Sequence, residues 1–255
     1  MILKNYSITL PSYSIGDNVY SKIGEICEPY GKKVICIGGK TAISKVRDLI
    51  INECNGTSLE ILDFLWYGGD ATYENVNTLK ENELVKKADI IFGIGGGKAL
   101  DTAKALAYIT NKEIFTFPTI ASNCAGTTAV SIMYNADGSF KEPFFFTAPA
   151  RHCFIYTPVI AKSPAKYMWA GIGDTYAKYF EAEMSSRGED LVHYHALGVT
   201  TSQMCLTPLL KYGKKSLDDF KSGTASFEVE QVVLAIVVTT GIASILLTNE
   251  HIIDY

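Results

Sequence analysis

The sequence lacks the features that mark several classes of protein. Its six cysteines form no C-x-x-C pair, its lysines and arginines form no cluster, and no repeat or low-complexity tract interrupts the chain. With a formal net charge of -4 and no basic patch, the sequence argues against nucleic acid as the main partner. Residues 1–7 contain no charged segment followed by a long apolar run, so no export signal is visible.

The cysteines that are present indicate a reducing compartment. Several lie inside apolar stretches, as Cys36 does within residues 34–37, and cysteines in such surroundings are usually buried thiols. Together with the missing export signal, this pattern leads us to expect a cytoplasmic protein.

One uncharged, mostly aliphatic run, residues 232–247, has the composition of a membrane span but falls short of its length. A single-pass helix needs about 20 apolar residues, and Thr239, Thr240 and Ser244 interrupt this run. We therefore predict a buried core helix here and no membrane partner.

The remaining composition is that of a globular protein. At 255 residues, with 47% hydrophobic and 20% charged residues, the chain has room for one large domain or two modest ones. From residue 32 to residue 120, short aliphatic runs alternate with amphipathic stretches, which is typical of βα units around a mostly parallel sheet. The expected strands, each followed by glycine or proline, are 34–37, 59–66, 90–92 and 114–117.

The second half of the chain has a different pattern. Residues 129–157 predict a β-hairpin, because Asp137-Gly138 separates two β-prone stretches. Beyond the hairpin, helical periodicity dominates to the last residue with no further strand-like alternation. We therefore predict an α/β fold in which an amino-terminal Rossmann-like parallel-sheet domain, residues 1–160, precedes an all-helical, truncated carboxyl-terminal domain, residues 161–255.

The most informative segment is the glycine-rich turn at residues 93–97. It follows the strand at 88–92 and opens into an alanine-rich helix expected from Lys98. Glycine lets the backbone approach a ligand, and the free N–H groups and the dipole of a helix start attract phosphate. The turn is neither the G-x-G-x-x-G fingerprint, since Lys98 stands where the third glycine belongs, nor a P-loop. The residues alone thus leave open both phosphate binding and a merely tight strand-to-helix turn.

Three segments, in order along the chain, carry a resemblance to a known family: GGGKALDTAK at 95–104, FPTIAS at 117–122 and AGIGDT at 170–175. They resemble the metal-dependent polyol dehydrogenases of the iron-containing alcohol dehydrogenase superfamily, and the glycerol dehydrogenase branch in particular. The resemblance implies a nicotinamide coenzyme, NAD or NADP, on the α/β domain and one divalent metal ion, zinc or iron, in the helical domain. A small polyol or hydroxy-ketone would lie in the cleft between them.

The resemblance also assigns roles to residues. Asp174 would be the first metal ligand and would face the substrate, and His251 would be the second ligand, so that both would be catalytic through the metal. Cys124 would lie at the substrate position. The coenzyme-binding residues would be Gly39, Gly95, Gly96, Gly97, Lys98, Asp101, Thr119, Ser122, Thr128, Val130 and Tyr134.

The candidate ligands also have alternative interpretations. Asp174 precedes a helical pattern and could be its N-cap. His251 could be a surface histidine. It follows a glutamate, however, and in this it resembles the second metal ligand of the sister group, the sn-glycerol-1-phosphate dehydrogenases. His193 and His195 diverge on a helix because they lie two residues apart, so we assign them structural or surface roles, as we do His152.

The chain departs from the family pattern in three places. Cys124 stands where glycerol dehydrogenases have an aspartate that helps hold the polyol, so the substrate need not be glycerol. Gly39 stands where an aspartate binds the adenine ribose hydroxyls, which makes NADP admissible beside NAD. The third metal ligand of the family falls beyond Tyr255. Since catalytic sites normally use three protein ligands, we expect a fragment of a longer protein that by itself binds metal weakly.

Several functions are therefore compatible with the sequence. The first expectation is an NAD(P)-dependent oxidoreductase for a small polyol or hydroxy-ketone of the glycerol/dihydroxyacetone type, working as a homo-oligomer. A phosphorylated substrate, as in the sn-glycerol-1-phosphate dehydrogenases, is the nearest variant. A dehydroquinate synthase-like cyclase shares the implied fold. A non-catalytic nucleotide-binding module would explain the missing ligand and Cys124.

Overall fold

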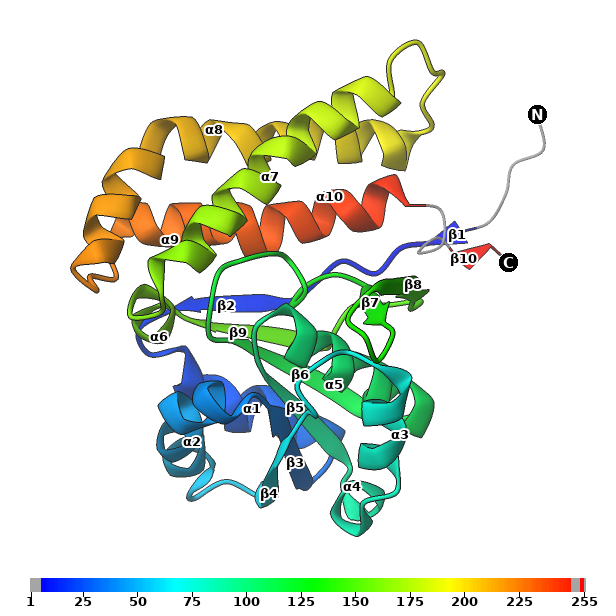
Figure 1. The fold of residues 1–255 in the computed structure, drawn as a ribbon, viewed down its shortest axis with the longest axis vertical. Helices are drawn as coiled ribbons and strands as arrows, with labels where there is room; N and C mark the ends of the chain where they lie inside the picture. Colours follow the sequence, from blue (N-terminus) through cyan, green and yellow to red (C-terminus); the bar gives the residue numbers. More distant parts are fainter. Residues whose placement is uncertain (1–5, 249–252, 255) are drawn as a thin grey trace.

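The computed structural model describes residues 6–248 and the backbone of residues 253–254 (Figure 1). A sheet flanked by helices forms the lower part of the view, and a group of long helices lies across the top. In chain order the elements are β1 (Tyr6–Ser7), β2 (Tyr13–Gly16), η1 (Val19–Lys22), α1 (Ile23–Cys27), η2 (Glu28–Tyr30), β3 (Lys33–Gly38), α2 (Lys40–Cys54), β4 (Glu60–Trp66), α3 (Tyr73–Lys80), α4 (Glu83–Lys87), β5 (Ile90–Gly95), α5 (Gly97–Thr110), β6 (Glu113–Pro118), β7 (Val130–Tyr134), β8 (Phe140–Phe145), β9 (His152–Tyr156), α6 (Thr157–Ala161), α7 (Ala165–Ser185), α8 (His193–Lys221), α9 (Phe227–Leu234), η3 (Ala235–Thr239), α10 (Thr240–Leu247) and β10 (Ile253–Asp254).

The main sheet has six parallel strands in the order β2, β9, β6, β5, β3, β4. The four strands expected from the sequence are confirmed as β3, β4, β5 and β6. Gly95 at the end of β5 pairs with Pro118 of β6 on one side, and Gly38 of β3 pairs with Ile94 on the other. The glycine-rich ends of β3 and β5 therefore lie side by side at the edge where ligands of parallel sheets bind.

Strands β2 and β9 complete one side of the sheet, and the sequence pattern does not predict them. β2 is short, and β9 begins with a histidine, yet His152 is buried. Its ring nitrogens lie 2.7 and 2.9 Å from the hydroxyls of Ser12 and Ser14. Burial lowers the pKa of His152 from 6.5 to about 4, so the neutral ring joins the β2 segment to β9.

Apolar residues cover both faces of the sheet. On one face the rings of Phe92, Phe115 and Phe117 are fully buried, and the ring of Phe92 contacts the other two. On the other face the buried alanines of α5, including Ala103 and Ala107, pack against the sheet. Because alanine side chains are small, α5 lies close to the strands, which fixes the position of its amino terminus.

Strands β7 and β8 form the predicted hairpin. They pair antiparallel, with Val130 opposite Phe145, and Gly138 in the turn has a φ of +82°. The Ser131 hydroxyl donates to the carbonyl oxygen of Asp101 at 3.0 Å. The hairpin is therefore attached to the first turns of α5, beside the glycine-rich turn.

Helices α7, α8 and the run of α9, η3 and α10 pack together above the sheet (Figure 1). Residues 227–247 are long and apolar enough to cross a membrane, but 67% of an apolar 18-residue stretch within them is buried in the fold. The predicted core helix is therefore confirmed. Its middle turn, η3, is a π-helix. Thr127 Oγ1 donates to the Val237 carbonyl, and the Ala235 carbonyl accepts both the backbone N–H and the hydroxyl of Thr240. Side-chain hydroxyls thus add to the backbone hydrogen bonds of the wide turn.

Two glycines let these helices touch the loop that follows β6. A Cβ on Gly171 of α7 would overlap the carbonyl oxygen of Ala121, and one on Gly241 of α10 would overlap the hydroxyl of Thr127. Only glycine permits both approaches. The loop of residues 119–129 is consequently held between the sheet and the helices.

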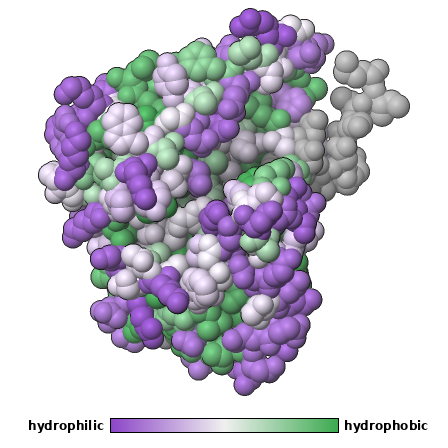
Figure 2. Space-filling model, viewed as in Figure 1, coloured by the Kyte–Doolittle hydropathy of each residue, from purple (hydrophilic) through white to green (hydrophobic). Residues whose placement is uncertain are grey.

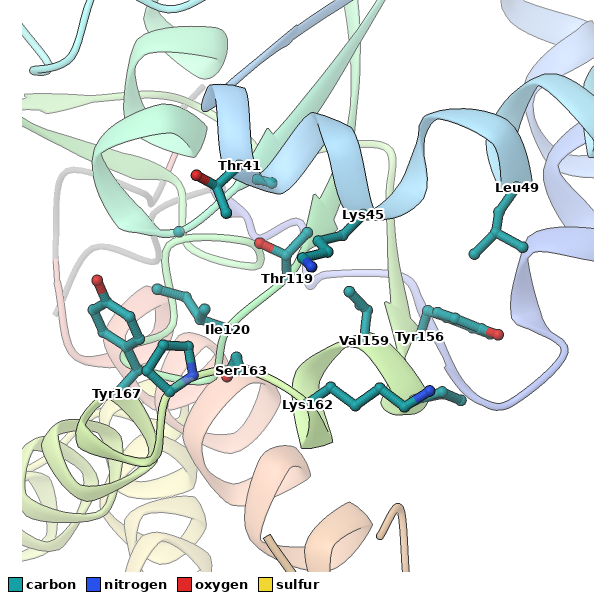
Figure 3. A pocket seen from close by; sticks show the side chains of 14 residues that line it. Thr41, Lys45, Leu49, Thr119, Ile120, Tyr156, Val159, Lys162, Ser163 and Tyr167 are labelled. Carbon is teal, nitrogen blue, oxygen red and sulfur yellow. The ribbon is translucent and has the colours of Figure 1, made fainter. Parts of the chain in front are cut away.

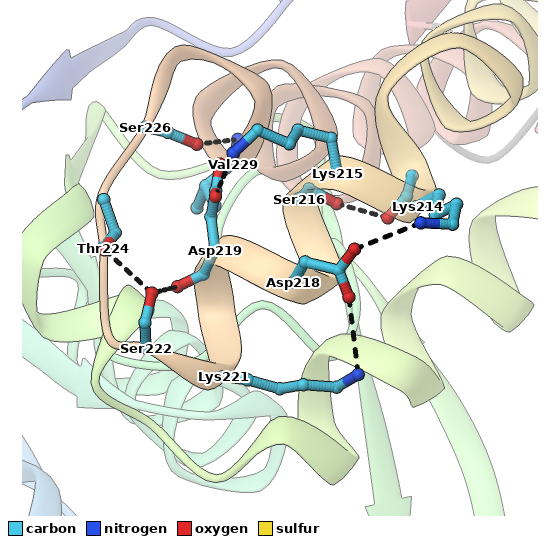
Figure 4. A network of polar contacts seen from close by, with 11 residues as sticks. Lys214, Lys215, Ser216, Asp218, Asp219, Lys221, Ser222, Thr224, Ser226 and Val229 are labelled. Atoms are coloured by element: carbon cyan, nitrogen blue, oxygen red, sulfur yellow. Dashed lines mark hydrogen bonds and ion pairs between the residues drawn. The ribbon is translucent and has the colours of Figure 1, made fainter.

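The turn between α8 and α9 is held by local polar contacts (Figure 4). Asp218 and Asp219 pair with Lys214 and Lys215, one helical turn earlier. Ser226 Oγ caps α9 by accepting a backbone N–H of its first turn at 3.2 Å. Because the lysines are exposed, each ion pair contributes little to stability.

One part of the fold prediction is wrong. The sequence pattern predicts no strand after the hairpin region, yet the backbone of Ile253–Asp254 forms β10 and pairs antiparallel with β1. A strand of two residues is too short to produce an alternating pattern, so periodicity carries no signal for it.

Candidate functional site

The candidate site is built around the junction between β5 and α5. Gly95 has a φ of +142°, which only glycine adopts readily, and Gly96 is the N-cap of α5 with no side chain to cap the helix. The helix begins at Gly97, one residue before the expected Lys98. The Thr119 amide donates to the Gly95 carbonyl at 3.1 Å. The free amides at the start of α5 are therefore available to an anion beside the 119–129 loop.

Two cavities meet at this junction. One, of about 550 Å³, runs along α2 and the α6–α7 turn (Figure 3). The other, of about 440 Å³, extends past Lys98 toward the hairpin. Gly96, Ala42, Ile120 and Tyr167 line both. A dinucleotide has two ends joined by a diphosphate, and a pair of cavities that meet at a helix amino terminus has the shape to receive one.

The structure gathers most of the coenzyme-binding residues that the resemblance assigns. Thr119 and Gly96 line the first cavity. The second is lined by Gly39, Gly95, Gly96, Gly97, Lys98, Asp101, Ser122 and Tyr134. Thr128 and Val130 line neither cavity.

Thr128 and Val130 instead bind a buried lysine that sequence reasoning missed. Lys104 Nζ donates to Thr128 Oγ1 at 3.2 Å and to the Val130 carbonyl at 2.6 Å. It also lies 3.1 Å from Asp101 Oδ1. Burial raises the pKa of Asp101, and the Lys104 ammonium opposes that shift. The only sequence signal for Lys104 is its i,i+3 spacing from Asp101 in an otherwise apolar helix.

Lys98 lies at the mouth of the second cavity. Its Nζ is 2.7 Å from Asp70 Oδ2 and 4.6 Å from the centre of the Tyr134 ring. The carboxylate and the ring face hold the ammonium at one place beside the glycine junction. Asp70 thus positions Lys98.

Asp174 lies in the middle of α7, so its interpretation as an N-cap is wrong. Its half-buried carboxylate has a pKa raised by burial, and Lys178 Nζ, one turn further, is 3.9 Å away. Burial, and to a smaller extent the nearby charge of Asp174, raise the pKa of Cys124 to about 12. The structure therefore brings Asp174 and a neutral Cys124 thiol to the same place, between α7 and the 119–129 loop.

The described residues do not make a metal site by themselves. Within residues 6–248 no group of three histidine, cysteine, aspartate or glutamate side chains could hold a metal ion. Asp174 is the one candidate ligand there, and His251 lies outside the described residues.

The other histidines and cysteines have ordinary surroundings. His193 begins α8 and is exposed, and the ring of His195 packs edge-on against Tyr194 at 4.5 Å. Apart from the partly exposed Cys124, the cysteines are free, buried thiols, as expected. Burial raises the pKa of Cys205, which contacts Thr240 in the helical core.

Comparisons with known proteins agree with this geometry. Residues 11–153 match the family model described as iron-containing alcohol dehydrogenase. The chain is 36% identical over 169 residues to a glycerol dehydrogenase of Thermotoga maritima, covering 64% of this chain and 46% of that protein. It is 26% identical over 234 residues to a glycerol dehydrogenase of Escherichia coli O6:H1, covering 90% of this chain and 64% of that protein.

A solved structure has the same fold. The glycerol dehydrogenase of Schizosaccharomyces pombe superposes with a TM-score of 0.84 at 24% identity, covering 94% of this chain and 62% of that one. The chain thus spans less than two thirds of the length of these relatives. The family model matches more than half of the chain, which therefore belongs to the iron-containing alcohol dehydrogenase family.

Proposed function

We propose that the protein is an NAD(P)-dependent oxidoreductase that transfers a hydride between the coenzyme and a small polyol or hydroxy-ketone. The observation that carries the proposal is the position of Gly96, at the amino terminus of α5 and at the meeting of two cavities. Membership of the family and the names of the curated relatives, glycerol dehydrogenases, support the same activity.

Different residues of the chain would bind different parts of the coenzyme or hold the site in place. The amides at the start of α5 receive the diphosphate, and Lys98, held by Asp70, adds positive charge beside it. The buried pair of Asp101 and Lys104 keeps the first turns of α5 and the hairpin in register below the second cavity. A bound nicotinamide supplies the hydride acceptor or donor.

The substrate pocket would lie where Asp174 and Cys124 approach each other. We propose that Asp174 and His251 hold a divalent ion, zinc or iron, which would polarise the reacting oxygen. Cys124 is neutral at physiological pH because its pKa is about 12. It therefore contributes a small, weakly polar surface instead of a carboxylate. Such a surface favours substrates that have fewer hydroxyl groups than glycerol.

We also propose two domains, residues 1–160 and 161–255, and a cytoplasmic homo-oligomer. The change from sheet to long helices after β9 supports the boundary. The buried thiols support a reducing compartment. Large exposed apolar side chains on the helices, such as Met184 and Leu210, support association through that region.

A second candidate, a nucleotide-binding module without catalysis, is favoured by the single metal ligand among the described residues. The two candidates can be separated by titrating the protein, in the longer form expected from the sequence and loaded with zinc, with NADH and NADPH. Oxidation of 1,2-diols is then screened by absorbance of the reduced coenzyme. The oxidoreductase predicts binding and turnover, with turnover lost in Asp174→Asn and coenzyme affinity kept.

The matched control is Asp218→Asn, which removes an exposed carboxylate in the α8–α9 turn and should change neither quantity. Coenzyme binding without turnover on any diol or ketone would favour the non-catalytic module. Absence of coenzyme binding would contradict both candidates.

A further inference from the structure

The cavity beside α2 carries positive charge and no negative charge. Two lysines line it from opposite sides, Lys45 from α2 and Lys162 from the turn after α6 (Figure 3). The remaining lining is neutral, with Thr41 and apolar side chains such as Val159. In the described part of the chain, no aspartate or glutamate is among its lining residues.

The two lysines differ from the other lysines near the site. Lys98 and Lys104 each have a carboxylate within 3.1 Å. Among residues 6–248, the ammonium group of neither Lys45 nor Lys162 makes an ion pair or a hydrogen bond. Two unpaired ammonium groups on opposite sides of a cavity make the cavity positively charged. That charge attracts an anionic ligand and is not needed to bind a neutral one.

Gly39, at the end of β3, is not required by packing. Its φ is -75°, and a Cβ would lie 3.7 Å from Tyr67 Cε1 and 3.9 Å from Ala42 Cβ, which are ordinary contacts. By contrast, a Cβ on the preceding Gly38 would overlap the Ile94 carbonyl oxygen. Position 39 could therefore hold a side chain. Gly39 itself lines the second cavity, next to Ala42, which lines both cavities, so its glycine leaves no carboxylate on this side of the boundary between them.

The amino terminus of α2 adds to the positive electrostatic potential of the cavity. Gly39 is the N-cap of this 15-residue helix, gives no side-chain cap, and is followed by a first turn without acidic residues. The free amides there are next to Thr41, whose side chain lines the cavity. Helix amides, a hydroxyl and two ammonium groups are the donors that bind a phosphate monoester.

We propose that this cavity takes an adenosine carrying an additional ribose phosphate, so that the chain prefers NADP(H) to NAD(H). The inference rests on the proposed function, in which the cavity beside α2 holds the adenosine half of the coenzyme. A carboxylate at the end of this strand typically binds the two ribose hydroxyls of NAD and repels a 2′-phosphate, and cationic side chains accommodate that phosphate. Here the carboxylate is missing and the cations are present.

The preference can be measured by fluorescence titration of the full chain with NADPH and with NADH, which requires neither metal nor turnover. We expect NADPH to bind at least about tenfold more tightly, since each charge-assisted hydrogen bond to the phosphate contributes about that factor. Lys45→Met should weaken NADPH binding about tenfold and leave NADH binding unchanged, and Lys162→Met should act in the same direction. Lys214→Met, remote from the cavity on the exposed surface of α8, is the matched control.

Introducing a carboxylate at position 39 tests the preference independently of the lysines. Gly39→Asp should weaken NADPH binding and strengthen NADH binding, so that the ratio of the two affinities inverts. Gly39→Asn, which has the same shape without the charge, should leave NADPH the tighter ligand. Gly39→Ala tests the tolerance of the position for a side chain, and we expect it to fold with an unchanged thermal midpoint.

Each outcome decides one of the two proposals. NADH binding as tightly as NADPH, or more tightly, would overturn the preference and leave the oxidoreductase proposal standing. Failure of both nucleotides to bind would overturn the proposed function, and the preference with it. A preference for NADPH that Lys45→Met and Gly39→Asp both leave unchanged would overturn the placement of the phosphate at this cavity.

Discussion

The sheet region and the helical region differ in how their candidate residues are held. In the sheet region Lys98, Asp101 and Lys104 have fixed partners beside a glycine junction whose backbone is itself constrained. In the helical region Asp174 is the one candidate ligand among the described residues, and large apolar side chains of α7 and α8 are exposed. These are Trp169, Tyr176, Phe180 and Met184 on α7, and Leu197, Met204 and Leu210 on α8.

Figure 2 shows apolar patches at the top of this face, over the long helices, and further apolar surface lower down, over the sheet region. The comparison teaches that the two halves of the site depend on different kinds of interaction. A coenzyme site made of backbone amides is complete within one βα unit and its neighbours. A metal site needs side chains from separate segments of the chain.

The largest expected effect is on the buried ion pair of the sheet region. Lys104→Met removes the ammonium from Asp101 and leaves a buried carboxylate without its partner, so we expect a loss of about 3–5 kcal/mol in the free energy of unfolding. Urea denaturation measures it. The helical counterpart, Lys214→Met, breaks an exposed pair and should change stability by less than about 0.5 kcal/mol. Equal effects of the two substitutions would remove the contrast between the regions.

A smaller effect is expected at the glycine junction. Gly95→Ala forces a side chain into a φ of +142°, which costs about 1–3 kcal/mol. Since the Gly95 carbonyl also accepts the Thr119 amide, a shift of this residue displaces the 119–129 loop, and coenzyme affinity should fall by more than about tenfold. A variant that keeps wild-type affinity in a fluorescence titration would show that the junction does not bind the coenzyme.

The pH dependence of stability gives a third test. His152 has a pKa of about 4 when folded and about 6.5 when unfolded, so the unfolded chain binds more protons between these values. Its contribution to stability is present above about pH 6.5 and is lost toward pH 4, by at most about 1.4 kcal/mol per pH unit. His152→Asn should flatten the profile measured by urea denaturation. The exposed His193→Asn is the control, and a profile that stays steep in His152→Asn contradicts the assignment.

The smallest expected effect is a gain in the helical region. Gly213 lies inside α8, and a Cβ there would have no neighbour within 4 Å. Gly213→Ala should therefore stabilise the fold by about 0.5–1 kcal/mol, because alanine favours the helix and restricts the unfolded chain. A rise in the thermal midpoint measures it, and a fall would mean that the surroundings of α8 are tighter than the structure indicates.

The sequence predicts the parts of the site that depend on neighbours along the chain. The strand, the glycines and the alanine-rich helix of residues 90–110 lie in one segment, and the turn they predict is correct to within one residue. The hairpin is likewise predicted by its own turn residues, Asp137-Gly138. In both cases the physical cause is local: the backbone freedom of glycine and the period of the apolar residues.

The sequence does not predict the parts that depend on distant contacts. Nothing near Lys104 in the chain reveals that Thr128 and Val130 bind its ammonium, because they lie 24 and 26 residues away. The burial of His152 depends on Ser12 and Ser14, which lie 140 and 138 residues earlier in the chain.

The most direct test of the account is a crystal structure of the chain with NADPH bound. We predict diphosphate oxygens within about 3.2 Å of the backbone amides that open α5, with the adenosine in the cavity beside Lys45 and the nicotinamide beyond Lys98. Coenzyme density at any other part of the surface, with these amides bound only to solvent, would contradict the account.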